Sequence, residues 1–359
     1  MPHSAEAIEK ACSSLERFVQ EYFNEKRSRY AYGDWFEPIY FDLCEYIGRK
    51  GKRIRPQILM ISYFAFGGKK EMTDPSVLKA ALAMELLHTF ILMHDDVIDR
   101  SDIRRGLPTF HKLVQRRLEP FDQSARYGEN IATVLGDMVF AMSVQALNET
   151  EFPPEVRSEV IRHFLDYAAD TGAGEILDIL LGTRDISRVD IADIEDMYYL
   201  KTTRYTFEAP CILGAVLAGA SEQKVIAIKK WVRPLGLAFQ IDNDLIEFRH
   251  LDVSKNGFPT DLLDGKKTVL IHEAYNSLDE VDRSFLQMCL GSERKTESTL
   301  IKIYDLIRKS GAIDRLAARN SKLFDKAEVM MEDPVFDSKE SSIMRTAIQG
   351  IKSQIKVAS

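Results

Sequence analysis

Apolar residues recur every three to four positions along almost all of this 359-residue sequence, and alternating strand-like runs are nearly absent. That spacing is typical of amphipathic helices. It predicts helices over residues 5–28, 36–49, 54–66, 75–100, 124–148, 154–182, 190–218, 222–250, 267–277, 280–290, 297–310, 312–330 and 340–355. Pairs such as Gly67-Gly68 and Pro153-Pro154 fall between these segments, as expected of short helix connections. We therefore predict an all-α fold in which a single large helical bundle spans residues 1–359.

The composition argues against several classes of protein. A net charge of −7 provides no basic field for a nucleic-acid partner. The four cysteines lie far apart without a C-x-x-C pair, which argues against a zinc knuckle. The amino terminus lacks the basic start and apolar run of a signal peptide. Since no stretch reaches about eighteen uninterrupted apolar residues, we expect a cytoplasmic chain without a transmembrane segment.

A cluster of aspartates ends the long apolar segment over residues 75–100. Asp95 and Asp99 lie one helical turn apart and therefore share a face, and Asp96 is adjacent. Two carboxylates on one face can bind hard cations such as Mg²⁺ together with phosphate oxygens. The alternative is a solvated helix end, which the helix dipole disfavours because carboxylates are more stable in the first turn. Arg104 and Arg105 follow closely, and paired guanidiniums can bind phosphate.

A second acidic segment runs from Gln240 to Glu247, with Asn243 and Asp244 between them. At helical spacing these side chains share a face and form a second, weaker group of oxygen donors; the alternative is a polar stripe on an exposed helix. The following Gly265-Lys266-Lys267-Thr268 predicts a turn that presents lysines to anionic oxygens. It lacks the upstream glycine and strand of a nucleotide P-loop, which argues against an ATPase.

Three further sets of residues leave two interpretations open. The basic run from Lys50 to Pro56 precedes an apolar helix and could bind phosphate or form a solvated face. Lys201-Thr202, after two tyrosines, could be structural or a phosphate ligand. His88 lies on the same face as Asp95, where a lone histidine is more often a core residue.

Taken in order, these motifs resemble the trans-isoprenyl diphosphate synthases, the family that includes farnesyl and geranylgeranyl diphosphate synthases. The resemblance covers roughly residues 45–270. Its most specific part is Asp95-Asp96-Val97-Ile98-Asp99 followed by Arg104-Arg105-Gly106. Supporting matches are Gly51-Lys52-Arg53-Ile54-Arg55-Pro56, Gly136-Asp137, Lys201-Thr202, Phe239-Gln240 and Gly265-Lys266-Lys267-Thr268. The resemblance implies the isoprenoid synthase type I fold, a helical bundle around a central cavity, and a homodimer.

The resemblance also implies a role for each matched residue. The diphosphate of isopentenyl diphosphate would be held by Lys52, Arg55, His88 and Arg105. The allylic diphosphate would contact Arg104, Lys201 and Lys266, with Thr202 and Gln240 nearby. Three magnesium ions would be ligated by Asp95, Asp99 and Asp244, and Asp96 completes the first catalytic motif. Phe90 and Ile91, just before that motif, would form the floor that limits product length, and a single aromatic there resembles producers of twenty carbons, with fifteen also possible.

The expected reaction is head-to-tail prenyl transfer. The allylic carbon–oxygen bond breaks, the double bond of isopentenyl diphosphate attacks the carbocation, and a proton leaves to the departing diphosphate. The chain departs from the family pattern at Glu175, Asn243, Glu247 and Gly257, where Lys255 could substitute for a missing lysine. These departures indicate altered activity or substrate preference. Two alternatives stay open: a terpene cyclase on the same fold, and a non-catalytic regulatory subunit of a synthase.

Overall fold

The computed structural model describes residues 2–30, 32–49, 51–104, 106–249, 258–292 and 295–357. Arg105, Lys255 and Gly257 lie outside this set, as does the side chain of Glu247. Over the described residues the chain is helical apart from turns, loops and one two-stranded hairpin, which confirms the predicted all-α class. The chain divides into two compact units, 1–163 with 213–220, and 164–212 with 221–359. The single domain around a central cavity stays a prediction.

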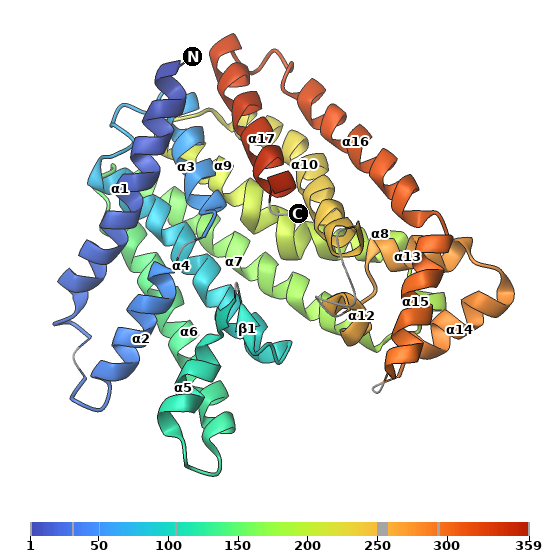
Figure 1. Ribbon diagram of the computed structural model, residues 1–359. Coiled ribbons are helices and arrows are strands. Elements are labelled where there is room, and N and C mark those ends of the chain that lie inside the picture. Colours follow the sequence, from blue (N-terminus) through green and yellow to red (C-terminus); the bar gives the residue numbers. More distant parts are fainter. Residues whose placement is uncertain are drawn as a thin grey trace. The chain divides into compact units, whose positions relative to one another are not determined.

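The first unit is built around one long apolar helix. Its complete elements are α1 (Pro2–Lys26), α2 (Glu37–Gly48), α3 (Ile54–Ala65), α4 (Pro75–Ile98), β1 (Ile103–Arg104), β2 (Leu107–Pro108), α5 (Phe110–Leu118) and α6 (Ser124–Asn148). Helix α4 begins at Pro75, where the side chain of Asp74 accepts a hydrogen bond from the Ser76 N–H and caps the helix. Helices α1, α3, α5 and α6 pack against α4 (Figure 1). Burial of α4 on several sides explains why its sequence is apolar nearly all round.

The second unit contains the remaining helices. They are η1 (Ile186–Arg188), α8 (Ile191–Tyr198), η2 (Tyr199–Glu208), α10 (Glu222–Arg249), α12 (Thr260–Asp264), α13 (Val269–Ser277), α14 (Glu280–Leu290), α15 (Glu297–Lys309), α16 (Ala312–Met330) and α17 (Ser338–Val357). Helices α7 (Pro154–Thr183) and α9 (Ala209–Ala218) each contribute residues to both units. Helix α10 packs against α16, η2, α13 and α8 (Figure 1).

Three local features differ from the sequence prediction. Helix α5 was not predicted, because only one nine-residue amphipathic stretch marks it. The hairpin that carries Arg104 is only two residues per strand, too short for an alternating pattern to be recognised. The segment predicted as one helix over 190–218 contains the ten-residue π-helix η2 between α8 and α9, and π-helical turns are frequent at functional sites.

Two helices, α4 and α6, are long and apolar enough to cross a membrane by length and composition alone. In α4, 78% of the apolar window is buried inside the protein, and in α6 44% is buried. The two helices pack against each other. Core helices of proteins that do not enter membranes meet the same criterion.

Candidate active site

The first acidic motif lies where α4 ends. Asp95 and Asp96 occupy the last turn and Asp99 is the C-cap residue, so the helix places Asp95 and Asp99 one turn apart, as predicted. Their surroundings differ: the Asp95 side chain is 18% exposed, whereas Asp96 is fully buried. Asp96 accepts a hydrogen bond from the Tyr46 hydroxyl at 3.2 Å. Burial raises the pKa of Asp96, although hydrogen bonds from Arg104 and Tyr46 oppose the shift.

Arg104 joins the two adjacent aspartates. After α4 the chain turns at Arg100, whose backbone is left-handed (φ +53°), and returns through the hairpin, which places Arg104 beside the helix end. Its guanidinium lies 2.5 Å from Asp96 and 3.1 Å from Asp95. An arginine paired with two carboxylates is held in one orientation. The structure therefore brings Arg104 to the acidic motif; its predicted neighbour Arg105 lies outside the described residues.

The basic run before α3 is organised by a residue that the sequence did not single out. Arg53 is the N-cap of α3 with a left-handed backbone (φ +44°), and its side chain is 6% exposed. The guanidinium pairs with Glu85 of α4 and with Glu16 of α1, and it donates to the Ile47 carbonyl at 2.9 Å. The predicted Lys52 is exposed and Arg55 half-buried on either side of this anchor.

A pocket in the first unit brings two predicted residues together. It is lined by Tyr46, Ile47, Arg49, Arg53, Glu85, His88, Thr89, Leu92 and Arg104. His88 and Arg104 are thus near one another, while Lys52 and Arg55 are not among the lining residues. Arg49 was not predicted from the sequence as a site residue. It donates a hydrogen bond to the Pro108 carbonyl at 2.7 Å, and its guanidinium stacks over the Tyr46 ring. All three arginines are paired with carboxylates: Arg49 with Glu45, Arg53 with Glu85 and Glu16, and Arg104 with Asp95 and Asp96. An anion in this pocket would share them with these carboxylates.

The predicted chain-length residues lie on α4 one turn before the acids. Phe90 and Ile91 are half-buried. The Phe90 ring packs on Phe140 of α6, with centroids 5.2 Å apart. The close approach of the two helices depends on Gly136, because a Cβ there would lie 2.6 Å from the His94 ring. The floor assignment stays a prediction.

In the second unit, Lys201 lies at the start of η2, between two acids of α7. Its ammonium is 2.8 Å from Glu175 and 2.6 Å from Asp178. The two helices touch closely here, since a Cβ on Gly174 would lie 2.3 Å from the Lys201 backbone nitrogen. Lys266 approaches the same Asp178 at 3.8 Å. The two predicted lysines therefore share Asp178, for which the sequence predicts no role.

The second acidic motif centres on Asp244 of α10, which is 4% exposed. One carboxylate oxygen accepts from the Gln240 amide at 3.2 Å, and the other accepts from the Tyr198 hydroxyl. Asn243 is half-buried. Thr202, half-buried, follows Lys201 on η2. The structure brings Gln240 and Asp244 together as predicted and adds Tyr198.

The lysine turn after α12 separates its two lysines. Gly265 takes the left-handed conformation (φ +69°) that ends α12, and the Thr268 side chain caps α13. Lys266 is half-buried, whereas Lys267 is 6% exposed and donates to the Gly182 carbonyl at 2.8 Å. Burial lowers the pKa of Lys267. Of the two lysines in this turn, Lys266 is therefore the one that lies near Asp178 and Lys201.

The carboxylates of the two acidic motifs fit a magnesium site completed by substrate phosphates better than a site made of protein ligands alone. Across the described ranges, no three His, Cys, Asp or Glu side chains are grouped to hold an ion by themselves. Mg²⁺ is commonly bound by one or two carboxylates and completed by substrate phosphates and water. Asp95 with Asp99, and Asp244, are donors of that kind.

The all-helical fold carries aspartates on α4 and α10 with arginines and lysines beside them, which fits an enzyme that acts on diphosphate esters. A family model described as "Polyprenyl synthetase" matches residues 37–307. The chain therefore belongs to the polyprenyl synthetase family, as its motifs predicted.

Relatives and solved structures agree with this assignment. The chain is 32% identical to a geranylgeranyl diphosphate synthase of Sulfolobus acidocaldarius, over 72% of this chain and 73% of that protein. It is 29% identical to a short chain isoprenyl diphosphate synthase of Methanocaldococcus jannaschii, with 72% and 73% covered. The structure is similar to that of Corynebacterium glutamicum geranylgeranyl pyrophosphate synthase complexed with isoprenyl diphosphate and magnesium: TM-score 0.85, 25% identity, 94% and 97% covered. The expected type I fold and prenyltransferase activity are thereby confirmed.

Proposed function

We propose that this prenyltransferase condenses isopentenyl diphosphate head-to-tail with an allylic diphosphate and releases geranylgeranyl diphosphate, or the shorter farnesyl diphosphate. The observation that carries the proposal is that the predicted diphosphate ligands occur in two sets, with Lys52, Arg55 and His88 in the first unit and Lys201 and Lys266 beside Asp178 in the second. Coupling needs sites for two diphosphates, whereas a cyclase needs only the allylic site. The relatives named as geranylgeranyl diphosphate synthases support the chain length.

The residues divide into two groups by the diphosphate they would bind. Lys52, Arg55, His88 and Arg105 would hold the diphosphate of isopentenyl diphosphate. Arg104, Lys201 and Lys266 would contact the allylic diphosphate, near Thr202 and Gln240. Because Lys201 already pairs with Glu175 and Asp178, the incoming diphosphate must compete with these carboxylates. This competition is one way in which Glu175, where the family usually has glutamine, would alter substrate preference.

Magnesium is the cofactor that these donors fit. Asp95, Asp99 and Asp244 would hold it, and we expect three ions. When bound, magnesium would withdraw charge from the allylic diphosphate and so assist cleavage of the carbon–oxygen bond. Asp96 is buried and would act by holding Arg104 rather than as a ligand. The apolar residues around Phe90 and Ile91 would exclude water, which would otherwise quench the carbocation.

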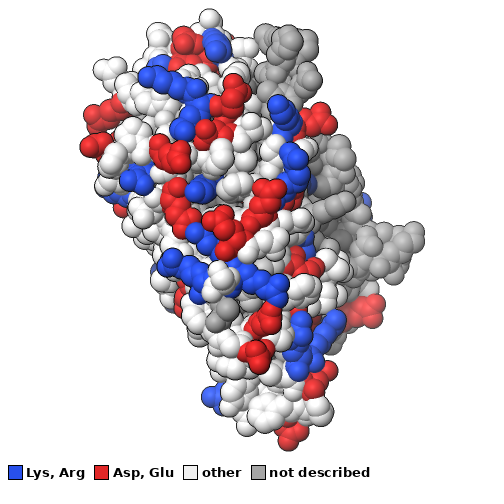
Figure 2. Space-filling view, turned by 90° about the vertical axis from the view of Figure 1, so that its left-hand side faces the viewer, with Lys and Arg blue, Asp and Glu red and all other residues white. Residues whose placement is uncertain are grey.

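The setting we propose is a cytoplasmic homodimer without a transmembrane segment and without a nucleic-acid partner. The net charge of −7 supports the last point. Acidic and basic side chains are also interspersed over the face shown in Figure 2, rather than gathered into one basic patch.

The test is incubation of the purified chain with magnesium, labelled isopentenyl diphosphate and one of three allylic diphosphates, of five, ten or fifteen carbons. Chromatography should show label in a prenyl diphosphate of up to twenty carbons. An unlabelled hydrocarbon made from the allylic substrate would indicate a cyclase. Untouched substrates would indicate a regulatory subunit, which should then raise the activity of a synthase partner.

A further inference from the structure

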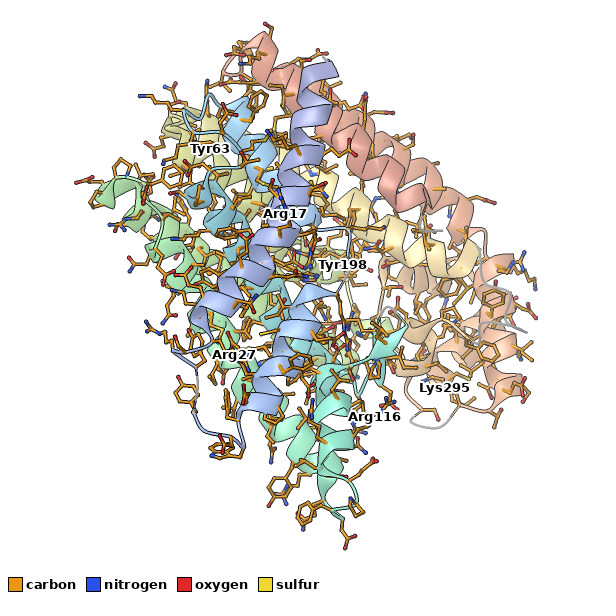
Figure 3. All side chains as sticks on the ribbon, turned by 60° about the vertical axis from the view of Figure 1, so that its left-hand side comes forward. Arg17, Arg27, Tyr63, Arg116, Tyr198 and Lys295 are labelled. Atoms are coloured by element: carbon orange, nitrogen blue, oxygen red, sulfur yellow. The ribbon has the colours of Figure 1, made fainter. Side chains whose placement is uncertain are left out.

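The hydroxyl of Tyr198 joins three segments of the second unit. Tyr198 is the last residue of α8, three positions before Lys201, and is 3% exposed. Its hydroxyl donates a hydrogen bond to Asp244 of α10, and it accepts one from the Val269 N–H at 3.1 Å. These partners are 46 and 71 residues away in the sequence. Figure 3 labels Tyr198 among the surrounding side chains.

The bond to Val269 holds the start of α13. Val269 is the first residue of that helix, where a backbone N–H has no partner within the helix. The Thr268 side chain satisfies the N–H of Ile271, and Tyr198 satisfies that of Val269. The lysine turn that carries Lys266 ends directly before this point, so the hydroxyl fixes one end of the turn.

The bond to Asp244 holds the carboxylate. With Gln240 on one oxygen and Tyr198 on the other, both oxygens have a donor and the group cannot rotate freely. A tyrosine hydroxyl is protonated at neutral pH and can therefore donate this bond. The ring packs in an apolar cluster that includes Ile241, Leu245 and Leu270.

We propose that Tyr198 is a positioning residue that fixes Asp244 and the lysine turn Gly265–Thr268 relative to each other, so that the carboxylate and Lys266 meet the same metal-bound diphosphate. The proposal rests on the proposed function, in which Asp244 binds magnesium. It assigns to Tyr198 no contact with substrate or metal. Groups that orient metal ligands in this way typically contribute about 10- to 100-fold to metal affinity.

The test is Tyr198→Phe, which removes the hydroxyl and keeps the ring. The matched control is Tyr275→Phe in the same unit, where a tyrosine that is 7% exposed donates to Gln287 at 3.2 Å, outside the acidic motifs. Calorimetry would measure the Kd for Mg²⁺ in the presence of inorganic diphosphate, without turnover. We expect Tyr198→Phe to raise this Kd about 10- to 100-fold and the control to leave it within about twofold of the wild-type value.

Val269→Pro probes the other bond and provides a second variant if Tyr198→Phe fails to fold. Proline is tolerated at the first position of a helix, and Thr268 already has the extended backbone (ψ 164°) that precedes proline. Loss of the N–H should loosen the lysine turn and weaken binding of inorganic diphosphate to the magnesium-loaded chain.

Three outcomes would overturn the inference. An unchanged Kd for Mg²⁺ in a folded Tyr198→Phe variant would show that Asp244 does not depend on the hydroxyl. Equal losses in Tyr198→Phe and Tyr275→Phe would show a general structural effect. If the wild-type chain bound no magnesium with diphosphate, the role of Asp244 would itself be wrong, so failure of the proposed function is distinguishable from failure of the inference.

Discussion

Removing Glu85 should destabilise the first unit strongly, because it breaks a buried ion pair at the start of α3. The side chains of Arg53 and Glu85 are each 6% exposed. Without Glu85 the guanidinium's remaining partners among the described residues are Glu16, whose side chain is 43% exposed, and two backbone carbonyls. Loss of one partner of a buried pair costs about 3 to 5 kcal/mol, since an uncompensated charge stays in the interior. We expect Glu85→Leu to lower the free energy of unfolding by that amount.

A double-mutant cycle separates the ion pair from packing. Arg53→Met combined with Glu85→Leu removes both charges, and replacing a whole buried pair is often close to neutral. The double variant should therefore be more stable than Glu85→Leu alone. Lys112→Met is the control, because its partner Asp102 is 70% exposed and such pairs contribute about 0 to 1 kcal/mol.

The assay is urea unfolding followed by far-ultraviolet circular dichroism, with the slope of the transition compared between variants. A Glu85→Leu variant within about 1 kcal/mol of the wild type would show that the buried pair does not stabilise the start of α3 as expected. So would a double variant less stable than both single variants.

Four further predictions concern the site. Asp95→Asn should lower kcat about 100-fold or more with unchanged circular dichroism, as loss of a charge-stabilising group does; unchanged product formation would refute the assignment. Gly174→Ala should lower the free energy of unfolding by about 1 to 3 kcal/mol, because the added Cβ forces η2 away from α7. Gly172→Ala is the control: a Cβ there has no neighbour within 4 Å, so the free energy of unfolding should be unchanged or higher. Asn243→Asp should lower the magnesium concentration needed for half-maximal rate, and a flat titration would count against this. Burial lowers the pKa of Lys267 below its ordinary value of 10.5, so near that pH the folded chain binds fewer protons than the unfolded chain. Stability then rises with pH. We therefore expect the difference in melting temperature between the wild type and Lys267→Met to shift in favour of the wild type as pH approaches 10.5.

The parts of the site that follow from local spacing could be predicted from the sequence. Asp95 and Asp99 share a face because α4 continues to Ile98, and the helical period alone specifies that. Gln240 and Asp244 meet for the same reason, one turn apart on α10. The ordered motifs around these residues were sufficient to predict the family.

The parts that depend on long-range packing could not be predicted. Tyr198 contacts Asp244 because α8 and α10 pack together, and neither segment's sequence indicates that the two helices are neighbours. Arg53 looked like one of several similar cations, although its left-handed backbone and its bond to Glu85 make it an anchor. Asp178 pairs with Lys201 because Gly174 allows α7 to pack closely against η2, and the sequence does not indicate this packing.

The most direct test of prenyl coupling is the mass spectrum of the product formed from unlabelled geranyl diphosphate and isopentenyl diphosphate fully labelled with carbon-13, in the presence of magnesium. We expect a fifteen- or twenty-carbon diphosphate in which one or two five-carbon units are heavy. A hydrocarbon without heavy carbon, or recovery of both substrates unchanged, would contradict prenyl coupling.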